Sequence, residues 1–176
     1  MKKGVKIFDK KGKKAQQIMG LSFGVIFSII LIVFFIVIAG IVINSFLKTG
    51  KCVKLGQFVD RFDKKIEEAW NSQGITTGFN GNLPSQIKYV CIFNLSDSTR
   101  GDFQEIGGDL EIYFGRNVNT FLYPLEEACQ IPVHNIKHLD INKITTNNNP
   151  NCFAIRKGKF SVEIEKGLND RFVTVK

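Results

Sequence analysis

Hydrophobic residues form one long uninterrupted stretch near the start of the chain, which is followed by shorter periodic patterns. No charged residue occurs between Lys14 and Lys48, and nearly every residue of 25–43 is aliphatic or aromatic. A helix of about 20 apolar residues crosses the hydrocarbon core of a bilayer, which is about 30 Å thick. Core helices of soluble domains are rarely apolar on every face over such a length. The pattern therefore predicts a transmembrane helix over residues 16–50.

Apolar residues resume after Cys52 at a spacing of three or four positions, with charged residues between them. This spacing is typical of an amphipathic helix. Its apolar stripe comprises Leu55, Phe58, Val59, Phe62, Ile66, Ala69 and Trp70. We expect the stripe to be core rather than a cofactor site, and Gly74 to cap the end of the helix. The polar residues around Gly50 interrupt the apolar pattern, which favours a kink or short linker there.

Alternating apolar and polar residues predict several short strands after a segment rich in turn residues at 75–85. The expected strands are 86–95, 110–114, 120–123, 133–141 and 172–175, with a short helical turn at 124–128 and a turn at 145–151. Residues 153–155 and 160–164 alternate on either side of Lys157-Gly158, which predicts a hairpin. The sequence thus predicts an α+β head over 51–176, with the amphipathic helix packed on a small antiparallel sheet.

The formal charge of +8 is concentrated at the N-terminus. Residues 1–14 hold seven lysines and one acid, Asp9, which leaves the rest of the chain at +2. A nearly neutral domain with an appended lysine tail does not match the basic patch of a nucleic-acid-binding protein. Lysines before an apolar helix follow the positive-inside rule and attract anionic lipids. We therefore expect residues 1–15 to be a cytoplasmic tail or leader, and the head to lie outside the cell membrane.

All four cysteines follow the apolar segment. They are Cys52, Cys91, Cys129 and Cys152. An even number of cysteines in a small exported domain favours two disulfides, and three pairings are possible. The absence of a C-x-x-C pair speaks against a zinc or redox site. The alternative is four buried free thiols, which an inverted topology would favour.

Few other residues suggest chemistry. His134 and His138 are four positions apart but lack the glutamate of a zinc-protease motif, so they are interpreted as polar residues on a partly exposed element. Gly107-Gly108-Asp109 shares its residues with a signature of cyclases that make cyclic dinucleotides, yet a turn before a strand explains it fully. No P-loop, nucleophile elbow or dinucleotide fingerprint occurs in the sequence. We expect no intrinsic catalysis, no metal and no cofactor.

Two short patterns concern packing and modification. Gly20, Gly24 and Ser28 recur every four residues, which predicts a helix-packing face for self-association or for a protein partner in the membrane. The alternative is that these small residues have no packing role, since glycine is common in membrane helices. Asn94-Leu95-Ser96 is an acceptor sequence for N-glycosylation.

The N-terminal arrangement resembles that of archaeal type IV pilin-like proteins with class III signal peptides. The resembling residues are Lys13-Lys14-Ala15-Gln16, directly before the apolar helix and a head of α+β type. The resemblance implies cleavage between Ala15 and Gln16 and packing of the freed helices into a filament core. Two features depart from the family: Gly20 stands where many pilins carry glutamate, and Gly50 interrupts the helical pattern. The chain also resembles uncharacterised single-pass membrane proteins of archaea, which implies no activity.

Three functions are compatible with these patterns. The first is a membrane-anchored extracytoplasmic structural or interaction protein without catalysis. The second is a pilin-like filament subunit processed before Gln16. The third is an accessory subunit of a membrane complex. The expected partners are the lipid bilayer and another protein, with no nucleic acid.

Overall fold

A computed structural model describes the backbone of residues 14–176 and the side chains of residues 23–176. The fold is α+β, as the sequence predicts, and begins with the long helix α1 (Lys14–Trp70). The chain divides after Lys48 into two units, of which the second, residues 49–176, contains all the strands. We call this second unit the head.

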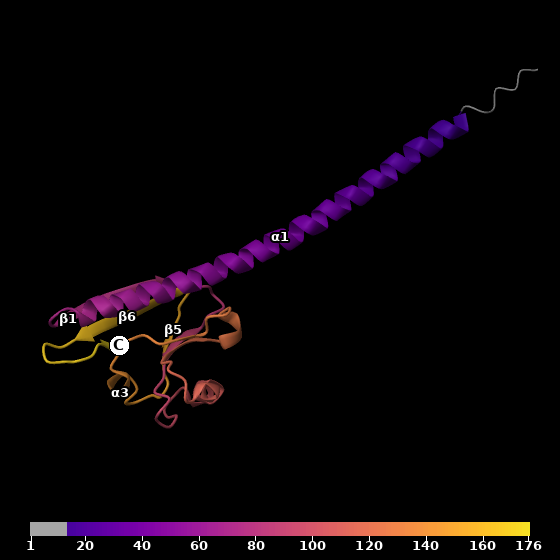
Figure 1. Cartoon of the computed structure of the whole chain (residues 1–176). Helices are drawn as coiled ribbons and strands as arrows, with labels where there is room; N and C mark the ends of the chain where they lie inside the picture. Colours follow the sequence, from indigo (N-terminus) through magenta and orange to yellow (C-terminus); the bar gives the residue numbers. More distant parts are fainter. Residues whose placement is uncertain (1–13) are drawn as a thin grey trace, which may run out of the picture. The chain divides into compact units, whose positions relative to one another are not determined.

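Helix α1 includes both the apolar and the amphipathic segments (Figure 1). The expected break at Gly50 is wrong, because residues 48–51 are helical. A glycine inside a helix costs only about 1 kcal/mol relative to alanine, which the helix-forming residues on both sides offset. The helix ends at Trp70, and Gly74, with a φ of 63°, lies in the turn before the first strand rather than at the helix cap.

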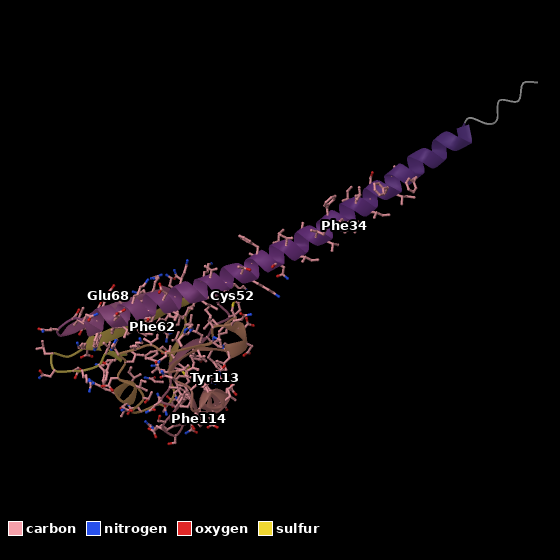
Figure 2. All side chains as sticks on the ribbon, viewed as in Figure 1. Phe34, Cys52, Phe62, Glu68, Tyr113 and Phe114 are labelled. Carbon is pink, nitrogen blue, oxygen red and sulfur yellow. A yellow bond between two sulfur atoms is a disulfide. The ribbon has the colours of Figure 1, made fainter. Side chains whose placement is uncertain are left out.

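The second half of α1 is amphipathic, as its periodicity predicts. The stripe of Leu55, Phe58, Phe62, Ile66 and Ala69 is buried, while Val59 and Trp70 are half-buried against the same core. The opposite side carries charged residues, including the ion pair of Lys64 with Asp60 at 2.9 Å. In Figure 2, Phe62 and Glu68 mark the buried and exposed sides of this part of the helix.

Two antiparallel sheets make up the strand part of the head, where the sequence predicts one. The first, sheet A, has the order β1-β6-β7, with β1 (Ile75–Asn82), β6 (Lys159–Lys166) and β7 (Thr174–Val175). The second, sheet B, has the order β4-β3-β2-β5, with β4 (Val133–His134), β3 (Thr120–Tyr123), β2 (Tyr89–Ile92) and β5 (Asn151–Ala154). Strands β3, β6 and β7 and the short 3₁₀ helix η2 (Leu125–Glu127) confirm the sequence predictions for these segments.

Four phenylalanine rings join α1 to sheet A. Phe58 and Phe62 of the helix pack against Phe79 of β1 and Phe160 of β6, with ring centroids 5.1–6.2 Å apart. All four side chains are at most 5% exposed. Aromatic pairs at these distances add about 0.5–1.5 kcal/mol each to the free energy of burial. We call this group the phenylalanine cluster.

Strand β1 occupies a segment that the sequence predicts as turns. Its glycines and asparagines are poor strand formers, but β1 pairs with β6 along all eight residues. Close packing explains why residue 81 is a glycine, because a Cβ at this position would lie 2.5 Å from the ring of Phe58. The phenylalanine cluster therefore requires a residue without a side chain here.

The predicted hairpin at 153–164 is partly wrong. The turn at Lys157-Gly158 forms and is closed by hydrogen bonds between Arg156 and Lys159. However, β5 pairs with β2 of sheet B, while β6 pairs with β1 of sheet A. The turn thus connects two different sheets instead of two neighbouring strands.

Two other segments differ from their predicted structure. Residues 110–114 are not a strand: Leu110 ends the helix α2 (Gln104–Leu110), and the 3₁₀ helix η1 (Glu111–Tyr113) follows. Leu110 is buried and Ile112 is 72% exposed, so the apolar residues follow helical and not alternating burial. Only two residues of 133–141 form a strand. Helix α3 (Ile141–Ile144) follows, with Asp140 accepting a hydrogen bond from the Lys143 backbone N–H.

Sheet B is buried on both faces. Val90, Ile92 and Leu122 belong to the core that contains the phenylalanine cluster. The alternate residues of the same strands, Cys91 and Phe121, belong to a second core that α2 covers. This double burial explains why the sequence around β2 is a nearly continuous apolar run.

The four cysteines form two disulfides, which resolves the three pairings that the sequence allows. Cys91 bonds to Cys152, directly opposite it in the pairing of β2 with β5. Cys52 bonds to Cys129, which joins α1 to the end of η2. The Cys91–Cys152 bond spans 61 positions in the sequence and the Cys52–Cys129 bond spans 77. Because closing a loop of this length lowers the entropy of the unfolded chain, each bond raises the free energy of unfolding by about 4 kcal/mol.

The phenylalanine cluster yields a stability prediction. We expect Phe62→Ala to lower the free energy of unfolding of the head by about 3–5 kcal/mol, because it removes a buried ring and leaves a cavity. Phe172→Ala is the matched control, since this ring is 38% exposed, and we expect a change below about 1 kcal/mol. Denaturant unfolding of the full chain in detergent, followed by the fluorescence of Trp70, measures both. Equal losses in the two variants would contradict the role of the cluster.

Candidate functional site

The apolar part of α1 is exposed on every side. Its large side chains from Phe23 to Leu47, including Phe34 (Figure 2), are between 38% and 78% exposed. Within the part of the chain that the structure describes, α1 is the one helix long and apolar enough to cross a membrane. Such a surface is costly in water, at about 25 cal/mol per Å² of apolar area, and favourable in lipid.

The predicted packing face is open where the structure describes it. A Cβ added at Gly24 meets no atom within 4 Å, and the hydroxyl of Ser28 donates a hydrogen bond of 2.8 Å to the Gly24 carbonyl. The hydroxyl is thus satisfied within its own helix and leaves no unpaired donor on this apolar surface. Gly20, Ala15 and Gln16 belong to α1, but their surroundings and those of residues 1–13 lie outside the described part. Packing and processing at these positions stay predictions.

The two histidines are not on one helix face. His134 lies in β4, and its Nε2 atom is 2.9 Å from the carbonyl of Ile131. His138 stacks on the indole of Trp70, with ring centroids 3.7 Å apart. Among the residues described, no group of three or more His, Cys, Asp or Glu side chains is placed to hold a metal. The contacts of the two imidazole rings are thus with different residues, the carbonyl of Ile131 for His134 and the indole of Trp70 for His138.

The segment Gly107-Gly108-Asp109 is helical, so the predicted turn before a strand is wrong. It forms the end of α2, and the Asp109 carboxylate accepts a hydrogen bond of 2.8 Å from the Tyr123 hydroxyl. This bond to a carboxylate raises the pKa of Tyr123 above its usual value. Gly107 is buried, and a Cβ at this position would lie 2.6 Å from the side chain of Thr99, which leaves no room for a larger residue. Close packing and a helix-to-sheet hydrogen bond account for this segment.

The side chain of Asn94, the predicted glycosylation site, makes two hydrogen bonds within the head. The Asn94 amide nitrogen donates to the side-chain oxygen of Asn142 at 3.0 Å, and its oxygen accepts from the Ser96 backbone N–H. Asn94 is half-buried. A glycan at this nitrogen would replace the bond to Asn142, so modification stays a prediction.

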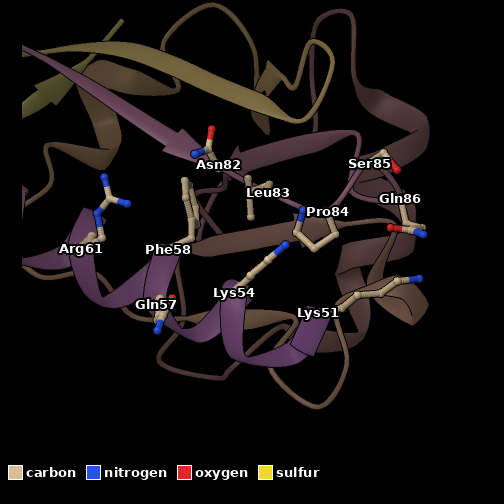
Figure 3. A pocket seen from close by; sticks show the side chains of 10 residues that line it. All are labelled: Lys51, Lys54, Gln57, Phe58, Arg61, Asn82, Leu83, Pro84, Ser85 and Gln86. Atoms are coloured by element: carbon tan, nitrogen blue, oxygen red, sulfur yellow. The ribbon is translucent and has the colours of Figure 1, made fainter. Parts of the chain in front are cut away.

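The head contains a basic hollow that sequence reasoning missed. It has a volume of about 500 Å³ and lies between one face of α1 and the segment that leads from β1 to β2 (Figure 3). The helix contributes Lys51, Lys54, Gln57, Phe58 and Arg61, and the segment contributes residues 82–86. The lining set holds three cations and no Asp or Glu. The signal available in the sequence was the spacing of these cations on the helix, with Lys54 three residues after Lys51 and Arg61 seven residues after Lys54.

Arg61 has a fixed position at the end of this hollow. One of its guanidinium nitrogens donates to the carbonyl of Asn80 at 3.2 Å, and its carbon lies 6.0 Å from the centre of the Phe79 ring. A guanidinium has five N–H donors, so these contacts leave several of them for an additional acceptor. The geometry suits an oxyanion better than a metal or an uncharged ligand.

Comparison of the chain with protein-family models, with curated proteins and with solved structures found no match.

The environment of His134 yields a pH prediction. Burial lowers the pKa of His134, outweighing the Ile131 carbonyl and Asp63, which raise it. The unfolded chain, with an ordinary histidine pKa of about 6.5, therefore binds this proton more tightly than the folded head. We expect the free energy of unfolding to fall as the pH drops below about 6.5, and to level off below the folded-state pKa.

Denaturant unfolding at a series of pH values measures this effect. His134→Gln keeps a donor for the Ile131 carbonyl and removes the titration, so its stability should depend less on pH below the ordinary histidine pKa of about 6.5. His138→Gln leaves His134 in place and should retain the acid-induced loss. A steeper pH dependence in His134→Gln than in the unaltered chain would be incompatible with the buried neutral imidazole.

Proposed function

We propose that the chain is a single-pass membrane protein whose head is an extracytoplasmic structural or interaction module without catalysis of its own. The observation that carries this proposal is the exposed apolar surface of α1 from Phe23 to Leu47, which a bilayer would cover. The head supplies its own core and two cross-links. It is thus suited to an aqueous space outside the membrane.

Two independent features support an orientation with the head outside. Seven lysines within residues 1–14 precede the apolar segment, and such lysines are retained on the cytoplasmic side. Both disulfides lie in residues 49–176, and disulfides persist in oxidising compartments. A cytoplasmic head would contradict both of these rules at once.

Topology in native membranes tests this proposal. We expect the protein to stay in the membrane fraction after alkaline carbonate washing, and added protease to reach the reduced head in intact spheroplasts. Peptide mapping without reduction should recover the bonds Cys52–Cys129 and Cys91–Cys152 and no free thiol. Release by carbonate would reject the anchor. A head digested only after permeabilisation, with four free thiols, would reject the orientation.

A filament subunit is the second candidate, and the continuity of α1 favours it. The helix passes through Gly50 without a break, which removes one of the two departures from the pilin pattern. A subunit of this kind needs an apolar helix that packs against its copies and a head that remains outside. The open side of Gly24 offers a close approach for such packing.

The N-terminus and the state of association distinguish the two candidates. A filament subunit should begin at Gln16 in intact-mass analysis, whereas an anchored protein should retain Met1 or Lys2. We expect Gly24→Leu to weaken self-association, measured by cross-linking in mild detergent. Gly40→Leu is the control, because it lies 16 residues away and thus about 160° around the helix. An intact leader and equal cross-linking in both variants would eliminate the filament subunit. Co-purification of a larger protein would instead favour an accessory subunit.

A further inference from the structure

We propose that the basic hollow of the head binds the phosphate group of an anionic lipid headgroup. The proposal rests on the proposed membrane anchor and deepens it by assigning a lipid class to a site in the head. It is carried by the charge, the shape and the position in the chain of the residues that line the hollow.

The cations in the amphipathic half of α1, residues 51–70, separate into two groups. Lys64 and Lys65 form ion pairs with Asp60 and Glu68 at 2.9 and 3.0 Å. The other three cations between Lys51 and Trp70 are Lys51, Lys54 and Arg61. None of these three belongs to an ion pair of the described residues, and all three line the hollow. The cations of residues 51–70 that lack an ion pair are therefore gathered at one place.

The shape of the hollow matches an amphiphilic ligand. Its wall combines the buried ring of Phe58 and the buried side chain of Leu83 with polar groups from Gln57 and Ser85. The ammonium groups of Lys51 and Lys54 extend from the helix toward the segment of Pro84 and Gln86 (Figure 3). Lysine ammonium groups and a partly free guanidinium are the usual donors to phosphate oxygens. A phosphate would satisfy donors that have no acidic partner in the described structure.

The position in the sequence selects a lipid over a soluble anion. Lys51 follows Leu47, the last residue of the apolar segment, by four residues. Four residues reach at most about 14 Å in any conformation. The polar region of a bilayer extends about 5–8 Å beyond each side of the hydrocarbon core. Once the apolar segment is in the membrane, headgroup phosphates are the anions in greatest local concentration at the hollow.

Lipid binding by the full chain tests the inference. The chain is purified in a neutral detergent, and phosphatidylglycerol or phosphatidylcholine is added while bound lipids are counted by native mass spectrometry. The double variant Lys51→Gln/Lys54→Gln removes two cations of the hollow, and a triple variant adds Arg61→Gln. The control Lys64→Gln/Lys65→Gln removes the same charge from the same helix. The lysines of residues 1–14 are present in every protein and contribute equally.

We expect phosphatidylglycerol to bind more tightly than phosphatidylcholine, and each removed cation of the hollow to weaken its binding about fivefold. The control should bind as the unaltered chain does. Hydrogen exchange of residues 82–88 should slow on addition of phosphatidylglycerol, and this protection should be lost in the double variant. The double variant keeps the contacts of Arg61 with Asn80 and Phe79, so a folding defect in the triple variant leaves the test intact.

Three results would overturn the inference. These are equal binding of the two lipids, unchanged binding by the double variant, and an equal loss in the control. Displacement of the lipid by inorganic phosphate, with the same protection of residues 82–88, would reassign the hollow to a soluble phosphate. A protein that resists carbonate extraction yet shows no lipid preference refutes this inference alone. Release by carbonate refutes the anchor on which it rests.

Discussion

Burial of the α1 stripe against sheet A is the interaction on which the rest of the head depends. The stripe supplies one side of the main core, and Phe79 and Phe160 supply the facing side. Each large apolar side chain buried in this way contributes about 1.5–3 kcal/mol. A small sheet needs a covered hydrophobic face, here supplied by a helix, to be stable. The helix that continues into the apolar segment is thus also the element that holds the sheet.

Sheet B has a different basis for its stability, since both of its faces are covered. Helix α2 closes the second core through Ile106 and Leu110, and the Cys91–Cys152 bond joins the two strands at the centre of that core. A fully buried asparagine, Asn149, closes the loop that follows β2. Its side chain donates to the carbonyls of Asn94 and Ser98 and accepts from the Asn94 backbone N–H. Buried backbone groups need such partners, at about 1–3 kcal/mol for each one left unsatisfied.

The amphipathic half of α1 has three chemically different sides, and this arrangement relates its fold to its proposed roles. One side is apolar and enters the core of the head. A second side carries compensated charges, with Lys64 beside Asp60. A third side carries Lys51, Lys54 and Arg61, which face the segment after β1. Ion pairs on an exposed helix contribute little stability, so the unpaired cations cost the fold little and are available for a ligand.

Local periodicity determined the parts of this protein that depend on neighbours in sequence. The apolar run before Lys48, the helical stripe from Leu55 to Ala69 and the alternation in 160–164 each imply an element because the side chains of that element share one environment. An even number of cysteines after the apolar run likewise implied two bonds. These signals do not require knowledge of any distant contact.

Tertiary structure alone decided what depends on contacts between distant residues. Residues 75–82 form a strand against their local propensity because β6 pairs with them and because Phe58 occupies the space beside Gly81. The pairing of the cysteines follows from the position of β5 beside β2. The basic hollow exists because residues 51–61 of α1 meet residues 82–86, which lie more than 20 positions further along the chain. Such contacts arise only when the chain packs, because burial and ring contacts between remote residues leave no periodic trace in the sequence.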